Sequence, residues 1–355
     1  MIASATAADY EMVVATVLRD PRVDAVITIF VRPLATRAAD VAAAVEAAAH
    51  GPAHRLVLAV FMGGDAPPPP PPEGGVARFA GPEEAARALG HALEYARHRN
   101  AAPDPPAELR DADRDRAAAI IATGLGGNGG WHEPAAVEAL LGAYGVPYVA
   151  SRMTTSPRDA ARAATELGGD VAVKAVASGL VHKSDAGGVR LGLAGAAAVQ
   201  RAARELAEAV RVAGHEPDGF LVQAMAPAGT ELLVGVVGDP SFGPLIAVGA
   251  GGETAELVGD VQVRLAPVGP REAAAMLRAL RTFPLLDGFR GRPQADMGSV
   301  EDIVQRVARL AADHPAIAEL DCNPVIAGPA GALVVDARVR LDAPPPRRPY
   351  AALDR

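Results

Sequence analysis

The chain has 355 residues and a formal net charge of −8, and half of its residues are apolar. This length suggests two or three domains, and the acidic balance argues against nucleic acid or an anionic membrane surface as the main partner. The sequence has no apolar run long enough to span a bilayer and no signal-peptide pattern at its start. Its single cysteine, Cys322, excludes an internal disulfide and a clustered cysteine metal site. We therefore expect a soluble, cytoplasmic protein that could still bind a small anion at a locally basic site.

The first hundred residues alternate between helical and strand patterns. Strands are predicted at 23–31 and 55–64, with a short third at 76–79, and helices at 7–19, 38–49 and 82–98. This alternation predicts a parallel sheet with right-handed crossovers, although the strands are few for an independent doubly wound domain. The proline run from Pro67 to Pro72 predicts an extended surface loop.

Residues 101–128 are predicted to be a linker between two domains. Proline and charged residues are frequent over 100–116, and a short helix at 116–123 leads to GLGGNGG at 124–130. No strong strand precedes these glycines, and no acidic residue follows at the spacing of a dinucleotide-binding motif. We therefore interpret them as flexible.

The rest of the chain mixes helices with strands that pair locally. Ser156 is a candidate cap for a helix that Gly168 and Gly169 end. A final hairpin is expected around 328–331. The other predicted helices are 133–144, 157–167, 195–212, 270–281 and 299–313, and the strands lie within 146–153 and at 170–176, 189–193, 219–226 and the antiparallel pair 231–239 and 244–252. An α+β domain is thus expected over 129–342, with a disordered tail at 343–355.

Lysine occurs only twice among the 34 lysine and arginine residues, as Lys174 and Lys183. An ammonium group near the end of strand 170–176 can contact nucleotide phosphates as a point charge. The following string, HKSDAGGV at 182–189, places His182, Lys183 and Asp185 beside Gly187 and Gly188. Adjacent glycines let backbone N–H groups approach an anion, while the polar residues supply a phosphoryl acceptor, a charge and an orienting group. A polar surface turn is the alternative, but the combination favours a phosphate site.

Three oxygen-bearing side chains meet in the predicted final hairpin. Asp321 and Asn323 are two residues apart and share one face of a strand, and Asp336 is predicted to lie opposite Asn323. Together they offer the hard oxygen ligands that Mg²⁺ prefers, although an open polar face of an edge hairpin would have the same pattern. Cys322 is predicted to point to the other side as a buried apolar residue. Glu231 begins another strand, where it could accept from ribose hydroxyls or be a solvated strand-end charge.

These residues resemble a known family. Residues from about 133 to 342 are similar to the ATP-grasp domain of the ADP-forming (NDP-forming) acyl-CoA synthetases, including acetate–CoA ligases and relatives of succinyl-CoA synthetase. The matching stretches are VAVKAVASGLVHKSDAGGVRLGL, LVQAMAPAGTELLVGVVGDPSFGPLIAVGAGG, AELVGDVQVRLAPV, FPLLDGFRGRP and ELDCNPVIAGPAGALVVDARV. Residues 8–98 resemble the family's second flavodoxin-like ligase subdomain without its first strand. The implied fold is a partial flavodoxin-like parallel α/β domain at 1–100, followed by the ATP-grasp domain.

The resemblance also implies roles for individual residues. Lys174 would contact the nucleotide phosphates, and His182 would relay the phosphoryl group, surrounded by Lys183, Asp185, Gly187 and Gly188. Gln223 and Glu231 would lie near the adenosine end, Asn323 and Asp336 would hold Mg²⁺, and Asp321 would face a travelling phosphohistidine. Arg264, a nucleotide-side residue, would form the site walls with Glu256, Asp260, Arg290 and Arg292. Ala224 departs from the usual glutamate of the family, so a side-chain contact at the adenine end is lost.

The family reaction converts acyl-CoA, phosphate and ADP to the acid, CoA and ATP through an acyl phosphate and a phosphohistidine. Lysines, Mg²⁺ and glycine N–H donors suit such phosphoryl transfer. The sequence shows no CoA-binding Rossmann unit and no subdomain with the primary phosphohistidine. We therefore expect an acid–thiol ligase component that uses ATP/ADP and Mg²⁺ and needs a second subunit for CoA and the carboxylic acid.

Three other interpretations are a nucleotide-sensing regulatory module, a degenerate fragment, and an unrelated ATP-grasp ligase that couples a carboxylate to an amine. Phosphoryl transfer to His182 would separate the enzyme from the sensor. The intact string at 174–189 argues against decay of the site. The HKSDAGGV string and the ligase-like N-terminal domain argue against the amine-coupling ligase.

Overall fold

The computed structural model describes residues 5–31, 36–51, 55–63, 70–100, 102–127, 129–177, 188–252 and 258–343. The chain divides into two compact units, residues 1–103 and 104–355. A parallel sheet in the first unit and antiparallel sheets in the second confirm the expected fold class. Within the described ranges, none of the helices combines the length and the apolar character that a bilayer span requires.

The N-terminal unit is a three-stranded parallel sheet in the order β1-β2-β3 with helices on both faces. Its helices bury alanine and valine side chains against one face, and Leu58 and Val60 face the other side with Ala85 of α3. All six predicted elements are present. They are α1 (Ala7–Leu18), β1 (Ala25–Val31), α2 (Ala38–Ala49), β2 (Leu56–Met62), β3 (Ala77–Phe79) and α3 (Pro82–Asn100).

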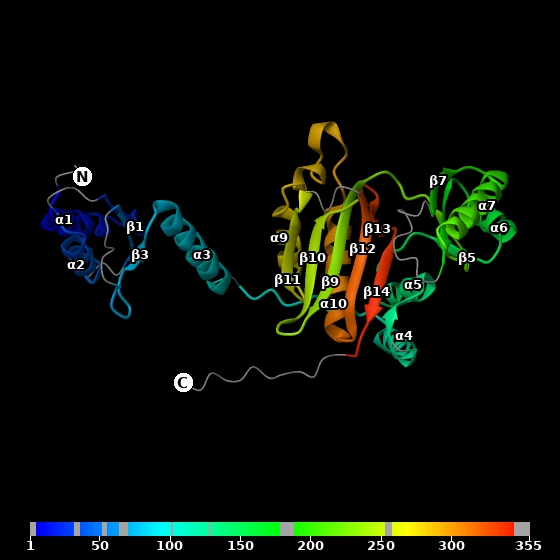
Figure 1. The fold of residues 1–355 in the computed structure, drawn as a ribbon, viewed down its shortest axis with the longest axis horizontal. Helices are drawn as coiled ribbons and strands as arrows, with labels where there is room; N and C mark the ends of the chain where they lie inside the picture. The colour runs from blue at the N-terminus through cyan, green and yellow to red at the C-terminus, as the bar shows by residue number, and fades with distance from the viewer. Residues whose placement is uncertain are drawn as a thin grey trace. The chain divides into compact units, whose positions relative to one another are not determined.

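The C-terminal unit contains two sheets, each with its own apolar core (Figure 1). We call the larger part the large lobe: a seven-stranded sheet in the order β11-β10-β9-β12-β14-β4, with β13 paired to β12. Its strands are β4 (Gly130–Trp131), β9 (Thr230–Asp239), β10 (Gly243–Ala250), β11 (Val261–Leu265), β12 (Ile317–Gly328), β13 (Gly331–Val334) and β14 (Ala337–Leu341). Its helices are α4 (Arg114–Gly126), α5 (Pro134–Ala143), α9 (Pro270–Arg278) and α10 (Met297–Asp313), with the 3₁₀ turns η1 (Phe283–Leu285) and η2 (Phe289–Gly291).

The small lobe is a four-stranded antiparallel sheet in the order β5-β8-β6-β7. Helices α6 and α7 cover one face of this sheet (Figure 1) and bury Val171, Val173 and Val222 there. The predicted cap at Ser156 and the end at Gly168, which has a φ of 73°, are confirmed. The elements are β5 (Ser151–Thr154), α6 (Pro157–Leu167), β6 (Val171–Val176), β7 (Val189–Leu193), α7 (Ala196–Val212) and β8 (Gly219–Ala224).

The segment expected to be a linker, residues 101–128, contributes to the core of the large lobe. Ala117 and Ile121 of α4 are buried in that core. The Asp104 carboxylate accepts a 2.8 Å hydrogen bond from the backbone N–H of Glu272 at the start of α9. High proline and charge content therefore marks a segment without strands here. Polar contacts and the buried side chains of Leu109, Ala117 and Ile121 nevertheless attach it to the large lobe.

The two faces of the large sheet differ, and the difference places the candidate site. One face carries Ile246, Val236, Leu320 and Cys322 and is buried against the helices. Helix α10 lies behind the sheet in the view of Figure 1. The other face, which we call the open face, carries the residues in between, including the register row of Val263, Ala247, Gly235, Asp321 and Arg338.

Candidate functional site

Lys174 extends from the small lobe to the large lobe. It lies on β6, where its side chain is on the face of the sheet opposite α6 and α7. The residue is only 6% exposed, and its Nζ is 3.5 Å from Oδ1 of Asp336. A buried ammonium needs a charged partner, and Asp336 supplies one across the interface between the lobes. The neighbouring strand brings in Gly188, whose carbonyl accepts from the Ala175 N–H at 2.8 Å.

Asn323 and Asp336 lie side by side, as the predicted hairpin requires. The Asn323 N–H donates to the Asp336 carbonyl at 3.0 Å, and the turn joins Gly328 to Gly331. Oδ1 of Asn323 accepts a 3.2 Å hydrogen bond from the Gly252 N–H at the end of β10. The Asn323 amide oxygen is thus held by a backbone N–H, and the Asp336 carboxylate by the Lys174 ammonium.

Asp321 and Cys322 point to opposite faces of β12, as predicted. Cys322 is fully buried, and burial raises the pKa of its thiol well above the usual range. Burial also raises the pKa of Asp321, with Arg338 opposing this shift and the Asp336 and Glu319 carboxylates adding to it. Asp321 is two strand positions from Asn323 and lies next to Gly235, which offers no side chain to cover it. Asp321 therefore borders the site on the open face.

Gln223 is the second contact between the lobes at this point. It is 1% exposed on β8, and its Nε2 donates to the carbonyl of Val335, the residue before Asp336, at 3.2 Å. Its Oε1 is buried and has no hydrogen-bond partner. Tyr148 lies next to Gln223, and burial raises the pKa of its hydroxyl. The charges of Asp336, Cys322 and Glu138 raise this pKa further, whereas a hydrogen bond with Gln223 lowers it. Sequence reasoning did not single out Tyr148, because a lone tyrosine before a short strand carries no pattern.

Glu231 begins β9 and packs against the glycines that follow β10. A Cβ on Gly252 would lie 2.0 Å from Oε2 of Glu231, and a Cβ on Gly251 would lie 2.5 Å from the Leu232 backbone. Gly252 also has a φ of 78°, a conformation that residues with side chains rarely adopt, so the backbone there favours glycine. Glu231 and Asn323 therefore both contact Gly252, one through packing and the other through a hydrogen bond.

Other expected wall residues have separate partners. Arg264 is on the helix-covered face of the sheet, next to Ile246, and its Nε is 3.5 Å from Oε1 of Glu272. The structure does not bring it together with Lys174. Asp260 is 4% exposed and accepts hydrogen bonds from the backbone of residues 281 and 282 and from Oγ1 of Thr282. Arg290 has a φ of 54° and its guanidinium lies over the Phe289 ring, and Arg292 follows it after η2.

The remaining predicted residues lie outside the described part of the chain. They are His182, Lys183, Asp185, Gly187 and Glu256.

The oxygen donors that the structure places at this point fit a magnesium ion. Asn323 and Asp336 offer one amide oxygen and one carboxylate, which are hard ligands, next to a buried ammonium that suits phosphate. Mg²⁺ commonly takes one or two protein oxygens and completes its shell with water and nucleotide phosphates. Among the described residues, no three or more His, Cys, Asp or Glu side chains are grouped so that they could bind a metal ion.

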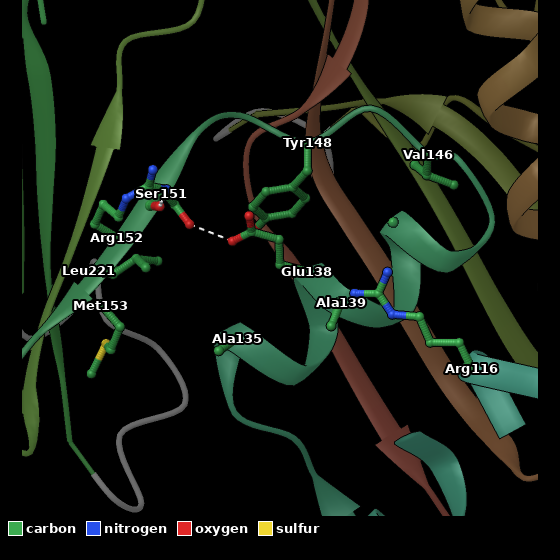
Figure 2. Close-up of a pocket in the computed structure, with 11 residues that line it drawn as sticks. Arg116, Ala135, Glu138, Ala139, Val146, Tyr148, Ser151, Arg152, Met153 and Leu221 are labelled. Atoms are coloured by element: carbon green, nitrogen blue, oxygen red, sulfur yellow. Dashed lines mark hydrogen bonds between the residues drawn. The ribbon is translucent and has the colours of Figure 1, made fainter. Parts of the chain in front are cut away.

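A cavity of about 540 Å³ lies beside Tyr148, between α4, α5 and the small-lobe strands β5 and β8. Figure 2 shows Ser151 of β5 and Glu138 of α5 facing each other, with Tyr148 next to them. Oγ of Ser151 donates to Oε2 of Glu138 at 2.5 Å. The cavity therefore borders the same interface between the lobes that Lys174 and Gln223 cross.

Comparison with known proteins agrees with this arrangement. Residues 125–341 match the family model of the ATP-grasp domain. The chain is 35% identical over 213 residues to the beta subunit of acetate–CoA ligase [ADP-forming] I of Pyrococcus furiosus, covering 59% of this chain and 90% of that subunit. It is 36% identical over 293 residues to acetate–CoA ligase [ADP-forming] I of Archaeoglobus fulgidus, covering 79% of this chain but only 42% of that ligase. The 79% share exceeds the C-terminal unit, so this alignment includes part of the N-terminal unit.

A solved structure has a similar fold over part of this chain. It is an acetyl-coenzyme A synthetase of Candidatus Korarchaeum cryptofilum in complex with coenzyme A and Mg-AMPPCP, with its phosphohistidine segment pointing towards the nucleotide-binding site. Its TM-score is 0.57 at 34% identity, covering 64% of this chain and all of that chain. With Lys174, Asn323 and Asp336 held together between its two lobes, this chain belongs to the ATP-grasp family and is a relative of the beta subunits of ADP-forming acetate–CoA ligases.

Proposed function

We propose that this chain is the ATP-grasp component of an ADP-forming acyl-CoA synthetase of the acetate–CoA ligase type. It would transfer a phosphoryl group between ATP/ADP and a phosphohistidine, coupled to the formation or cleavage of acyl-CoA. The observation that carries the proposal is the contact between Lys174 and Asp336 at 3.5 Å, next to Asn323. It puts a phosphate-binding cation and two hard oxygen ligands at one point, and this combination suits a metal–nucleotide complex.

In this proposal Lys174 binds the nucleotide phosphates, and the 182–188 segment surrounds them. His182 accepts and returns the phosphoryl group, with Lys183 and Asp185 beside it and the N–H groups of Gly187 and Gly188 aimed at the phosphates. Glu231 and Gln223 lie towards the adenosine end. Asn323 and Asp336 would hold Mg²⁺, which neutralises phosphate charge when bound.

Asp321 has a separate role in the proposal. Asp321 lies on the open face, and partial burial raises the pKa of its carboxyl group. Such a carboxyl can hold a proton or orient an imidazole that approaches over this face. We therefore assign Asp321 to the incoming phosphohistidine rather than to the metal.

A second subunit would supply CoA binding, the carboxylic acid and the primary phosphohistidine. Two findings support this division. The relative that the chain covers to 90% is described as a subunit, and the chain spans 42% of the Archaeoglobus ligase.

Nucleotide binding by the purified chain tests the proposal. The parent chain should bind Mg-ATP or Mg-ADP in titration calorimetry, and Asp336→Asn should remove most of the gain in affinity that Mg²⁺ gives. Glu319→Gln is the matched control, because Glu319 is a carboxylate of the same strand pair that faces Arg340 instead of Lys174. A parent chain that binds no nucleotide, or equal losses in both variants, would contradict the proposed site. Turnover to acyl-CoA by the chain alone would contradict the need for a partner.

A further inference from the structure

Polar side chains are rarely buried in this chain, and most of those that are lie in one place. Among the described residues, five polar or charged side chains are buried: Thr28, Ser151, Lys174, Gln223 and Asp260. Ser151, Gln223 and Lys174 all come from the small lobe, on neighbouring strands β5, β8 and β6. Ser151 and Gln223 are direct register partners.

Each of the three contacts a different group of the large lobe. Ser151 donates to Glu138 of α5 at 2.5 Å, Gln223 donates to the Val335 carbonyl at 3.2 Å, and Lys174 pairs with Asp336 at 3.5 Å. We call these three contacts the polar seam. Because buried polar groups are costly unless paired, the seam favours one spacing of the two lobes.

The three contacts differ in what nucleotide binding would do to them. Lys174 and Asp336 are the proposed phosphate and metal ligands, so their ion pair must open or be shared when a metal–nucleotide complex binds. Ser151 and Gln223 bond to groups that have no such role in the proposed reaction. Their contacts can therefore persist while the ion pair is exchanged.

We propose that Ser151 and Gln223 are positioning residues that set the spacing between Lys174 on the small lobe and Asn323 and Asp336 on the large lobe. This inference rests on the proposed function, because the spacing matters only to a ligand that binds both lobes at once. Metal-free nucleotide can be held through Lys174 alone. The magnesium complex needs both lobes at their correct separation, so loss of the seam should appear in the magnesium dependence of binding.

The test compares nucleotide affinity with Mg²⁺ and with EDTA in the full chain. Ser151→Ala and Gln223→Met should each reduce the Mg²⁺-dependent gain in ATP affinity by about threefold to tenfold, the range of one net hydrogen bond. For Ser151→Ala, whose side chain has no proposed contact with the nucleotide, affinity in EDTA should stay within about twofold of the parent. Ser151→Thr keeps the hydroxyl donor and should restore the gain.

Thr154→Val is the matched control. Thr154 is also a half-buried hydroxyl of β5, but its Oγ1 donates to the Phe220 carbonyl within the small lobe at 3.1 Å. The control should keep the full magnesium dependence. Circular dichroism checks that each variant is folded, and Ser151→Ala, the smaller change, carries the test if Gln223→Met does not fold.

Two results would overturn the positioning role while leaving the proposed function intact. One is a full magnesium dependence in Ser151→Ala and Gln223→Met. The other is an equal loss with Mg²⁺ and with EDTA in Ser151→Ala, which would mark direct nucleotide contact or general damage. A parent chain that binds no nucleotide at all would instead overturn the proposed function, and this inference with it.

Discussion

Replacing Lys174 by methionine separates its contribution to binding from its contribution to folding. Methionine keeps most of the side-chain length and removes the ammonium group. Because Lys174 is 6% exposed, the ammonium is desolvated, and its pairing with Asp336 at 3.5 Å mainly offsets that cost. The Coulomb attraction at this distance is about 5 kcal/mol at an effective dielectric constant of about 20, before desolvation is subtracted.

The two effects are measured separately. Removing the ammonium leaves the partly exposed Asp336 carboxylate without this partner, so stability without ligand should fall by about 1–3 kcal/mol. Hydrogen bonds from a charged group to phosphate are worth about 1.5–3 kcal/mol, so the dissociation constant for Mg-ADP should rise about 10- to 100-fold. Lys174→Arg should not restore binding, because a planar guanidinium does not fit where a compact ammonium is enclosed.

Titration calorimetry with Mg-ADP and urea denaturation measure the two quantities separately. Arg340→Met is the control, since it also removes a cation of an ion pair, with Glu319 on the open face. It should bind Mg-ADP like the parent. Parent-like affinity in Lys174→Met, or a loss of affinity that merely follows unfolding, would refute the reasoning.

Three further changes have defined outcomes. Cys322 is fully buried, and burial raises the pKa of its thiol. It should therefore resist a thiol reagent in the folded chain and react fully in urea. Stoichiometric reaction of the folded chain would contradict this prediction. The Asp260 carboxylate accepts hydrogen bonds from the backbone N–H groups of residues 281 and 282 and from the Thr282 hydroxyl. Asp260→Ala should therefore lower the free energy of unfolding, measured by urea denaturation, by about 2–4 kcal/mol. A decrease below about 1 kcal/mol would argue against a structural role for these hydrogen bonds. Burial lowers the pKa of His314 in the folded chain, so the unfolded chain binds a proton at this histidine at a higher pH than the folded chain does. The free energy of unfolding should therefore fall as the pH drops below about 6.5. His314→Asn should flatten that pH dependence, and an unchanged profile would contradict the prediction.

Local patterns determined most of the secondary structure. The Ser156 cap, the glycine end at 168 and the hairpin at 328–331 depend on neighbouring residues only, and each was predictable from the sequence. The opposite directions of Asp321 and Cys322 follow from strand periodicity in the same way. By contrast, α4 lay inside a segment that composition marked as a linker, because only the core against which it packs makes its two buried side chains useful.

The sequence by itself determined which residue types could form the site: two lysines in a chain otherwise rich in arginine, and an Asp321–Asn323–Asp336 pattern around a hairpin. Only the tertiary structure decided which of them meet. The Lys174–Asp336 contact joins residues 162 positions apart, on separate lobes. Arg264 fell on the far face of the sheet because strand β11 pairs in a register set by β10. Tyr148 and Ser151 carry no motif, and their positions depend on how two sheets pack, which no local pattern encodes.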